Sequence, residues 1–256
     1  MEGLRAKLRK CLKRTKAVVP LQLSMGFEEI KPECISRELN SSWQDPAVPQ
    51  KQYEECTKSE LRNYANGLPV VPFDALVNIL ADNIPNIACA EILEVGCSSG
   101  YYSEVLKIKG IHARYCGCDY SGAFIQFAKT LFPGVDFQVQ DARSLSYQDT
   151  SFDIVISGCC LLHILEYEQA IAEAARVSRQ YVVFHRTPVF HKKETTYYLK
   201  TAYGVKMFEI HFNERELFKL MHKYGLGVID VITYHPGLDT KYGEFSGYKT
   251  YLCRKI

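Results

Sequence analysis

The sequence contains no long hydrophobic run. Across its 256 residues, no segment approaches the roughly 18 consecutive apolar residues that a membrane-spanning helix requires, so we do not expect an integral membrane protein. The first residues, MEGLRAKLRKCLKRTK, also lack the continuous apolar stretch of a secretory signal. The composition, 47% hydrophobic and 23% charged, is close to the globular average and excludes disordered, collagen-like and disulfide-scaffold classes. A chain of this length accommodates one large α/β domain with an extension, or two small domains.

Paired metal-binding cysteines are also absent. The 10 cysteines include no C-x-x-C pair of the kind that starts a zinc site, so we expect no metal. Cys116 and Cys118, like the adjacent Cys159 and Cys160, fall in apolar, strand-like segments, where a free cysteine packs as a small hydrophobic residue. This pattern favours a reducing compartment, and we expect the protein to be cytoplasmic.

The sequence has little excess of positive charge outside its first 20 residues. Lys and Arg total 31 and Asp and Glu total 29, and residues 1–20 hold seven of the bases but only one of the acids. The remainder is therefore mildly acidic and lacks the basic face of a nucleic-acid-binding domain, so we expect no nucleic-acid partner. Leu4, Leu8, Cys11 and Leu12 have helical spacing among these bases. Such a helix suits either peripheral contact of residues 1–17 with the inner membrane surface or a solvated terminus.

The chain divides into three parts. We expect a basic amphipathic helix over residues 1–20, an irregular cap over 21–72 that contains Trp43 and five prolines, and an α/β domain over 73–256. From residue 90, short apolar strands alternate with helices, which predicts a doubly wound, mostly parallel sheet of seven strands with a Rossmann-like fold. The last two predicted strands, 228–234 and 248–254, have no helix between them and predict a C-terminal antiparallel hairpin. A polar and aromatic excursion over 186–212 follows the fifth strand.

Polar residues follow four of the predicted parallel strands, at the edge where open α/β sheets bind ligands. The first is the turn EVGCSSG, from Glu94 to Gly100, in which glycine allows close approach of a ligand. Asp119 ends the second strand and Asp141 ends the third, and a carboxylate at the end of the second strand can accept from both hydroxyls of a ribose. The fourth feature is the segment from Ser157 to His163, which leaves the strand that Asp153 opens.

These motifs, in this order, resemble the class I S-adenosylmethionine-dependent methyltransferases, and the resemblance covers roughly residues 70–254. It implies S-adenosyl-L-methionine as cofactor, with Asp119 on its ribose, Tyr120 beside the adenine, Asp141 accepting from the adenine amino group and the Ala142 backbone against the ring. It also implies that the loop after the first strand contacts the methionine part of the cofactor. The segment that begins at Ser157 would then run past the cofactor toward the substrate. The implied loop residues are Glu94, Gly96, Cys97, Ser98 and Gly100. Ser98 stands where the family has its middle glycine.

Several other readings of these residues remain open. Asp141 and Asp119 are also suited to capping a turn or a helix, and Cys97 and Ser98 to forming a turn without ligand contact. A nicotinamide-dependent oxidoreductase has an acid at the same place, but its G-x-G-x-x-G fingerprint differs from the spacing of Gly96 and Gly100. A methyltransferase-like fold that only binds a partner is a further alternative.

Methylation of a hydroxyl requires a general base, and His163 is the candidate because it leaves the fourth strand on the substrate side. His185 and Arg186 end the fifth strand, and His191 and Tyr203 lie in the excursion, where we expect a lid over the acceptor. Each of these side chains also suits a structural role. We therefore expect an enzyme that methylates a small molecule, such as a hydroxyl of a glycan, lipid-linked or secondary-metabolite acceptor; N-methylation is the alternative. The segment SGCCLLH lacks the N/D-P-P-Y motif of adenine and glutamine methylation.

Overall fold

The computed structural model describes residues 27–239 and 244–256. The amphipathic helix expected over residues 1–20, and with it the membrane-contact prediction, lies outside the described residues. Within the described residues, no helix is both long enough and apolar enough to cross a membrane.

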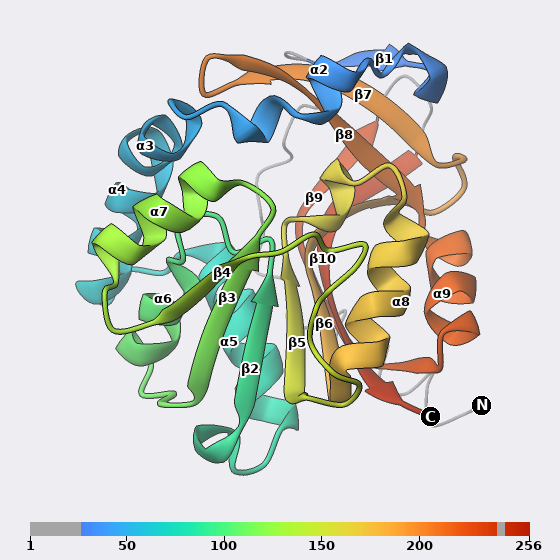
Figure 1. The fold of residues 1–256 in the computed structure, drawn as a ribbon. Helices are drawn as coiled ribbons and strands as arrows, with labels where there is room; N and C mark the ends of the chain where they lie inside the picture. The colour runs from blue at the N-terminus through green and yellow to red at the C-terminus, as the bar shows by residue number, and fades with distance from the viewer. Residues whose placement is uncertain (1–26, 240–243) are drawn as a thin grey trace.

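A twisted seven-stranded sheet forms the centre of the molecule (Figure 1). Its order is β4–β3–β2–β5–β6–β10–β9, and β10 is the reversed strand, antiparallel to both β6 and β9. The neighbours from β4 to β6 are parallel. The strands are β2 (Glu91–Val95), β3 (Arg114–Asp119), β4 (Asp136–Val139), β5 (Phe152–Gly158), β6 (Ser178–Phe190), β9 (Leu226–Asp239) and β10 (Glu244–Lys255). The predicted doubly wound sheet with a C-terminal antiparallel hairpin is confirmed.

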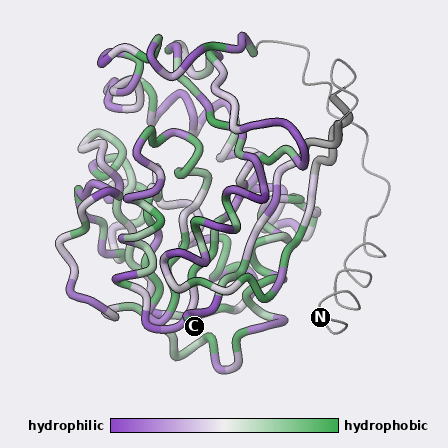
Figure 2. Tube along the Cα trace, turned by 90° about the vertical axis from the view of Figure 1, so that its right-hand side faces the viewer, coloured by the Kyte–Doolittle hydropathy of each residue, from purple (hydrophilic) through white to green (hydrophobic). Residues whose placement is uncertain are grey.

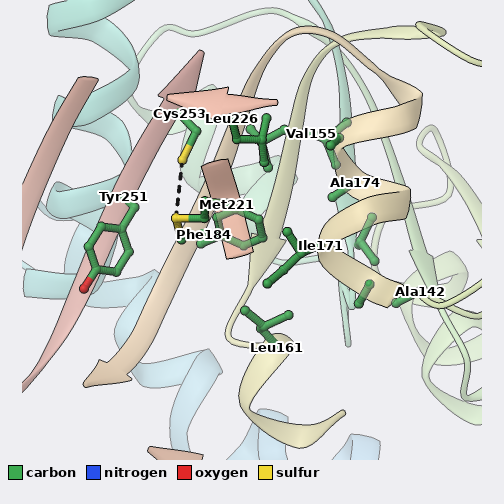
Figure 3. Close-up of a cluster of buried hydrophobic side chains, with 14 of the residues drawn as sticks. Ala142, Val155, Leu161, Ile171, Ala174, Phe184, Met221, Leu226, Tyr251 and Cys253 are labelled. Atoms are coloured by element: carbon green, nitrogen blue, oxygen red, sulfur yellow. Dashed lines mark hydrogen bonds between the residues drawn. The ribbon is translucent and has the colours of Figure 1, made fainter. Parts of the chain in front are cut away.

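Helices cover both faces of this sheet because its strands are apolar on both sides. In β5, Ile154 and Ile156 pack against α5 (Val71–Asn83) and α6 (Tyr102–Ile108), whereas Val155 between them faces the opposite core. That second core contains α8 (Tyr167–Val177) and α9 (Glu214–Lys223), and Figure 3 shows its side chains, including the contact between the sulfur atoms of Met221 and Cys253 at 3.9 Å. Helix α7 (Gly122–Leu131) packs near the β3–β4 edge.

The excursion predicted over residues 186–212 consists mostly of strands. Strand β6 extends to Phe190, and its last residues pair in parallel with the end of β8 (Val205–Asn213). Strand β8 forms a hairpin with β7 (Thr196–Ala202), and β7 pairs with β1 (Glu28–Ile30). Tyr203 and Gly204 connect the hairpin with φ angles of 53° and 81°, the left-handed pair that a tight two-residue turn requires. The hairpin lies above the carboxyl edge of the central sheet (Figure 1).

The cap is more helical than the sequence predicted. After the short helix α2 (Arg37–Asn40), helical turns continue from Val48 to Ala65 through α3 (Val48–Gln52), a π-helical turn (Tyr53–Thr57) and α4 (Lys58–Ala65). The irregular segment predicted from the five prolines thus contains helices. Pro49 lies in the first turn of α3, where a missing N–H has no cost. Figure 2 shows hydrophilic stretches along this cap region, at the top of the view.

Candidate active site

A cavity opens at the carboxyl edge of the sheet, between the cap, the strand ends and the β7–β8 hairpin. It has about 1260 Å³ of empty space, counted with the part of its mouth that is open to solvent. Most of the residues that the sequence singled out line it: Glu94, Gly96, Cys97, Ser98, Asp119, Tyr120, Asp141, Ala142, His163, Arg186 and Tyr203. Gly100, Ser157, His185 and His191 are not among its lining residues.

The β2–α6 loop is bent sharply at the base of the cavity. Gly96 has a φ of 72°, and a Cβ atom there would overlap the side chain of Cys160. Ser98 takes the same left-handed region, at 49°, which explains why a glycine suits this position. Its hydroxyl contacts the Gln52 side-chain oxygen of the cap at 3.0 Å, so the serine adds a bridge that glycine cannot make.

Two predicted cofactor-binding residues serve packing. A Cβ atom at Gly100, where φ is 76°, would overlap the ring of Phe137. Ser157 is buried near the end of β5 and does not reach the cavity. Cofactor contact by these two residues stays a prediction, and Gly100 shapes the loop that lines the cavity.

Asp119 has the buried carboxylate that a ribose site needs. Its Oδ1 accepts from the Ser121 backbone N–H at 2.9 Å and its Oδ2 accepts from the Ser98 N–H at 3.0 Å. Because each oxygen has two lone pairs, each can accept one more hydrogen bond from the cavity. Burial raises the pKa of this carboxyl to about 6, against the opposing effect of the backbone hydrogen bonds.

Glu94 lies beside Asp119 and is 1% exposed. Burial raises the pKa of Glu94 well above its usual range, while a hydrogen bond from the Tyr115 hydroxyl opposes the shift. Glu94 thus places a buried carboxyl group, which accepts a hydrogen bond from Tyr115, in the lining of the cavity.

Asp141 is placed at the cavity but is already engaged by Arg143. The guanidinium contacts both carboxylate oxygens, at 2.7 to 3.1 Å, and also contacts Glu166 at 2.9 Å. These hydrogen bonds hold the pKa of Asp141 below its usual value. A contact between Asp141 and an adenine amino group would therefore share the carboxylate with Arg143.

His163 lies in the short turn Leu161–His163 after β5 and is partly buried. Its Nδ1 is 2.8 Å from the carbonyl oxygen of Phe208, so in the neutral ring Nδ1 carries the proton and donates it to that oxygen. Its Nε2 is then free of a proton and can accept one. Burial, with a smaller contribution from the Lys200 charge, lowers the pKa of His163 to about 4, and the ring is therefore neutral at pH 7.

Two histidines predicted to bind the acceptor have other roles. His185 is buried, and its ring nitrogens contact the Tyr102 hydroxyl at 2.6 Å and the Thr250 hydroxyl at 2.7 Å. His191 Nδ1 is 2.8 Å from a carboxylate oxygen of Glu214, and His191 is not among the residues that line the cavity. His185 thus connects β6 with α6 and β10, and His191 contacts the first residue of α9, so acceptor binding by either residue stays a prediction.

A buried charged cluster on the cavity wall was missed by the sequence reasoning. Glu209 of β8 is fully buried and accepts from Lys200, from His211 at 3.1 Å and from Tyr248 at 2.9 Å. Burial alone would raise the pKa of Glu209, but the hydrogen bond from His211 and the charge of Lys200 outweigh it and lower the pKa. Trp43 of the cap also lines the cavity, with its ring 4.8 Å from that of His163.

Comparisons with known proteins agree with this geometry. Residues 93–184 match the family model described as "Methyltransferase domain". A probable S-adenosylmethionine-dependent methyltransferase of Mycolicibacterium smegmatis is 30% identical over 94 residues, covering 37% of this chain and 36% of that protein. The phthiotriol/phenolphthiotriol dimycocerosates methyltransferase of Mycobacterium tuberculosis is 34% identical over 94 residues, 35% of this chain and 34% of the relative. The chain thus spans about a third of the length of these curated relatives.

A solved structure extends the similarity of the fold to nearly the whole chain. The Burkholderia thailandensis 1,6-didemethyltoxoflavin-N1-methyltransferase, with bound 1,6-didemethyltoxoflavin and S-adenosylhomocysteine, aligns with a TM-score of 0.59 and 16% identity. The alignment covers 93% of this chain and 100% of that one. At this identity the comparison establishes the fold alone.

The donor groups of the cavity suit S-adenosylmethionine. A ribose offers two adjacent hydroxyl donors, and Asp119 offers two buried oxygens that can each accept one more hydrogen bond. The same cofactor is indicated by three further observations: the reversed strand β10, the loop at Gly96 and the family match over residues 93–184. Residues 93–184 therefore match the methyltransferase-domain family, and the described chain has the Rossmann-like fold of class I S-adenosylmethionine-dependent methyltransferases.

Proposed function

We propose that the protein transfers a methyl group from S-adenosylmethionine to a hydroxyl of a small-molecule acceptor. The observation that carries the proposal is that one cavity contains both Asp119, the candidate ribose ligand, and His163, the candidate base. The cofactor supplies an electrophilic methyl group on a sulfonium. The task of the protein is to align an acceptor with it and to exclude water.

His163 is oriented for the base role. Its Nδ1–H donates to the Phe208 carbonyl oxygen, which leaves Nε2 as the acceptor for a hydroxyl proton. With a pKa of about 4 the ring is neutral, although weakly basic, so proton removal would accompany methyl transfer and not precede it. An amine or ring nitrogen with a free lone pair would need no such step, which keeps N-methylation as the alternative.

The acceptor class follows from polar and aromatic side chains in the same cavity. Tyr203 at the tip of the β7–β8 hairpin and Trp43 of the cap, with ring centroids 6.0 Å apart, border the acceptor side and suit the expected lid. The relative from Mycobacterium tuberculosis is named for phthiotriol and phenolphthiotriol dimycocerosates, and the Burkholderia structure for the N1 position of 1,6-didemethyltoxoflavin. We favour a glycan, lipid-linked or secondary-metabolite acceptor.

The expected peripheral contact of residues 1–17 with a membrane at the cytoplasmic side also stays a proposal. Its test is flotation with liposomes that contain anionic lipids, for the full chain and for a variant without residues 1–17. Equal binding of the two would exclude the contact.

Calorimetric titration with S-adenosylhomocysteine tests the proposed function. We expect the wild type to bind with micromolar affinity. Asp119→Ala should lower the affinity roughly tenfold or more, because the ribose hydroxyls lose the buried carboxylate to which they would donate two hydrogen bonds. Asp136→Ala removes an exposed carboxylate from the nearby strand β4 and should bind like the wild type.

Since Asp119 also accepts two backbone N–H groups, thermal unfolding must show that each variant is folded. Asp119→Asn, which keeps the shape of the side chain, serves as the second variant. A folded wild type that does not bind S-adenosylhomocysteine would contradict the proposal and favour a non-catalytic binding protein.

A further inference from the structure

Arg186 differs from the other cationic side chains of the cavity because it has no anionic partner. Arg143 is paired with Asp141 and Glu166, and Lys200 with Glu209. Within residues 27–239 and 244–256, Arg186 forms no ion pair within 4.0 Å and no side-chain hydrogen bond, yet it lines the cavity. A charge that is removed from water without a partner is costly, and its presence in a cavity indicates a ligand that supplies the missing anion.

A β-bulge places Arg186 at this position. Phe184 pairs with Tyr251 and Thr187 pairs with Lys249, so His185 and Arg186 together oppose the single residue Thr250. Arg186 has a φ of 56°, in the left-handed region that side-chain-bearing residues rarely adopt. Bulges of this kind redirect a side chain and are frequent beside active sites.

The bulge is held by buried contacts on both sides. His185 bonds the Thr250 hydroxyl of β10 through one ring nitrogen and the Tyr102 hydroxyl of α6 through the other. Both histidine and threonine are nearly inaccessible to solvent. The strained backbone at Arg186 is therefore fixed by its neighbours, which is the arrangement expected when the redirected side chain has a function.

Among the described residues, the surroundings of Arg186 supply aromatic side chains, and each carboxyl group lies beyond the 4.0 Å of an ion pair. Glu60 of α4 is the nearby acid, but it makes no ion pair with Arg186, and its burial raises its pKa above the usual value. Tyr101, Tyr203 and Tyr248 line the same cavity. The buried indole nitrogen of Trp43 has no hydrogen-bond partner in the described part of the chain, and it lines the cavity as well.

The position of Arg186 along the sheet assigns it to the acceptor. The cofactor residues follow β2, β3 and β4, whereas Arg186 lies on β6, and β5 separates β6 from β2. His163, the candidate base, follows β5 and is therefore between the two regions. One unpaired positive charge matches one negative charge, which fits a carboxylate better than a doubly charged phosphate.

We propose that the acceptor carries a carboxylate, and that Arg186, redirected by the bulge in β6, binds this carboxylate. This inference rests on the proposed function and specifies its substrate class. Arg186 is thus a specificity-determining residue: it selects a carboxylated acceptor over its neutral analogue, and His163 faces the same molecule.

The test compares matched probes on the protein saturated with S-adenosylhomocysteine. The probes are small hydroxy acids, aromatic and aliphatic, each paired with its primary amide, and binding is measured by ligand-observed NMR and calorimetry. We expect carboxylates to bind the wild type more tightly than their amides. Arg186→Gln should lower the affinity for carboxylates roughly ten- to hundredfold and leave the amides unchanged, because a charge-assisted hydrogen bond is lost. Arg186→Lys should restore part of the preference.

Arg215→Gln is the matched control, since it removes an exposed arginine from α9 and should keep the carboxylate preference. The titration with S-adenosylhomocysteine that precedes the probes reports on the proposed function by itself. If Arg186→Gln weakens S-adenosylhomocysteine itself and not the probes, Arg186 binds the carboxylate of the cofactor and the inference is overturned. Equal binding of acids and amides by the wild type, or binding of neither, also overturns it.

Discussion

Unusual backbone conformations gather around the cavity. Among the described residues, six that are not glycine have a positive φ, and four of them line it: Ser98, Cys159, Arg186 and Tyr203. Each such residue costs on the order of 1 kcal/mol or more and persists only where the surrounding structure enforces it. The strained backbone around the cavity therefore lowers the stability of the fold, but it fixes the positions of these side chains.

Gly96→Ala tests how tightly this edge is packed. We expect a loss of about 2–4 kcal/mol in the free energy of unfolding, because the new Cβ is strained at a φ of 72° and overlaps Cys160. Gly110→Ala is the matched control: its φ is 75°, but nothing lies within 4 Å of the added atom, so it reports the backbone strain alone, about 1–2 kcal/mol. Urea unfolding measures both. Equal losses would show that the Cys160 side chain simply moves away.

At the scale of single elements, strand β8 carries a buried acidic residue, Glu209. Glu209 receives hydrogen bonds from Lys200 of β7, His211 of its own strand and Tyr248 of β10, and so joins the hairpin to the central sheet. Its carboxylate is inaccessible to solvent, so its ionised form depends on these donors.

Glu209→Gln should therefore lower the free energy of unfolding by roughly 3 kcal/mol at pH 7, since Lys200 loses the anion with which it pairs and the buried His211 and Tyr248 side chains lose a charged acceptor. Because the pKa of Glu209 is lowered in the folded state, its contribution is present above the unfolded pKa of about 4.3 and is lost as the pH falls below it. The difference in the free energy of unfolding between wild type and variant, measured by chemical denaturation, should become smaller toward pH 3. Glu168→Gln, which removes one partner of an exposed ion pair, should leave the free energy of unfolding nearly unchanged at either pH. A constant difference across this pH range would contradict the ionised role of Glu209.

The sequence predicted those elements whose signal is local. Apolar runs such as Ile92–Leu93 and Ile154–Ile156 predict strands buried on both faces, and Asp119 and Asp141, at or just after the ends of the parallel strands β3 and β4, lie at one edge of the sheet. The cluster at Glu209 could not be predicted, because an acid that pairs with residues 9 and 39 positions away has the same local sequence as a solvated one. The partners of His185 could not be predicted for a related reason: the end of a strand indicates an edge of the sheet, but Tyr102 and Thr250 are distant in sequence.

At the scale of the whole molecule, the cavity is the place where the cap meets the sheet. The cap contributes Asn40, Trp43 and Gln52 to the lining, and the contact between the Gln52 and Ser98 side chains joins it directly to the β2–α6 loop. A ligand that fills the cavity contacts both parts, so its binding energy stabilises the docked cap as well as the loop.

Hydrogen exchange of the amide groups should reveal this coupling. With saturating S-adenosylhomocysteine we expect slower exchange in the cap helices over residues 48–65 and in the β2–α6 loop, because opening of the cap then requires the ligand to leave. Helix α9 packs away from the cavity lining and is the internal control, in which exchange should change little. Gln52→Ala, which removes the contact with Ser98, should speed exchange in the cap of the free protein and reduce the difference made by the ligand. Protection confined to the loop, with the cap unchanged, would show that the cofactor binds the sheet alone and that the cap responds only to the acceptor.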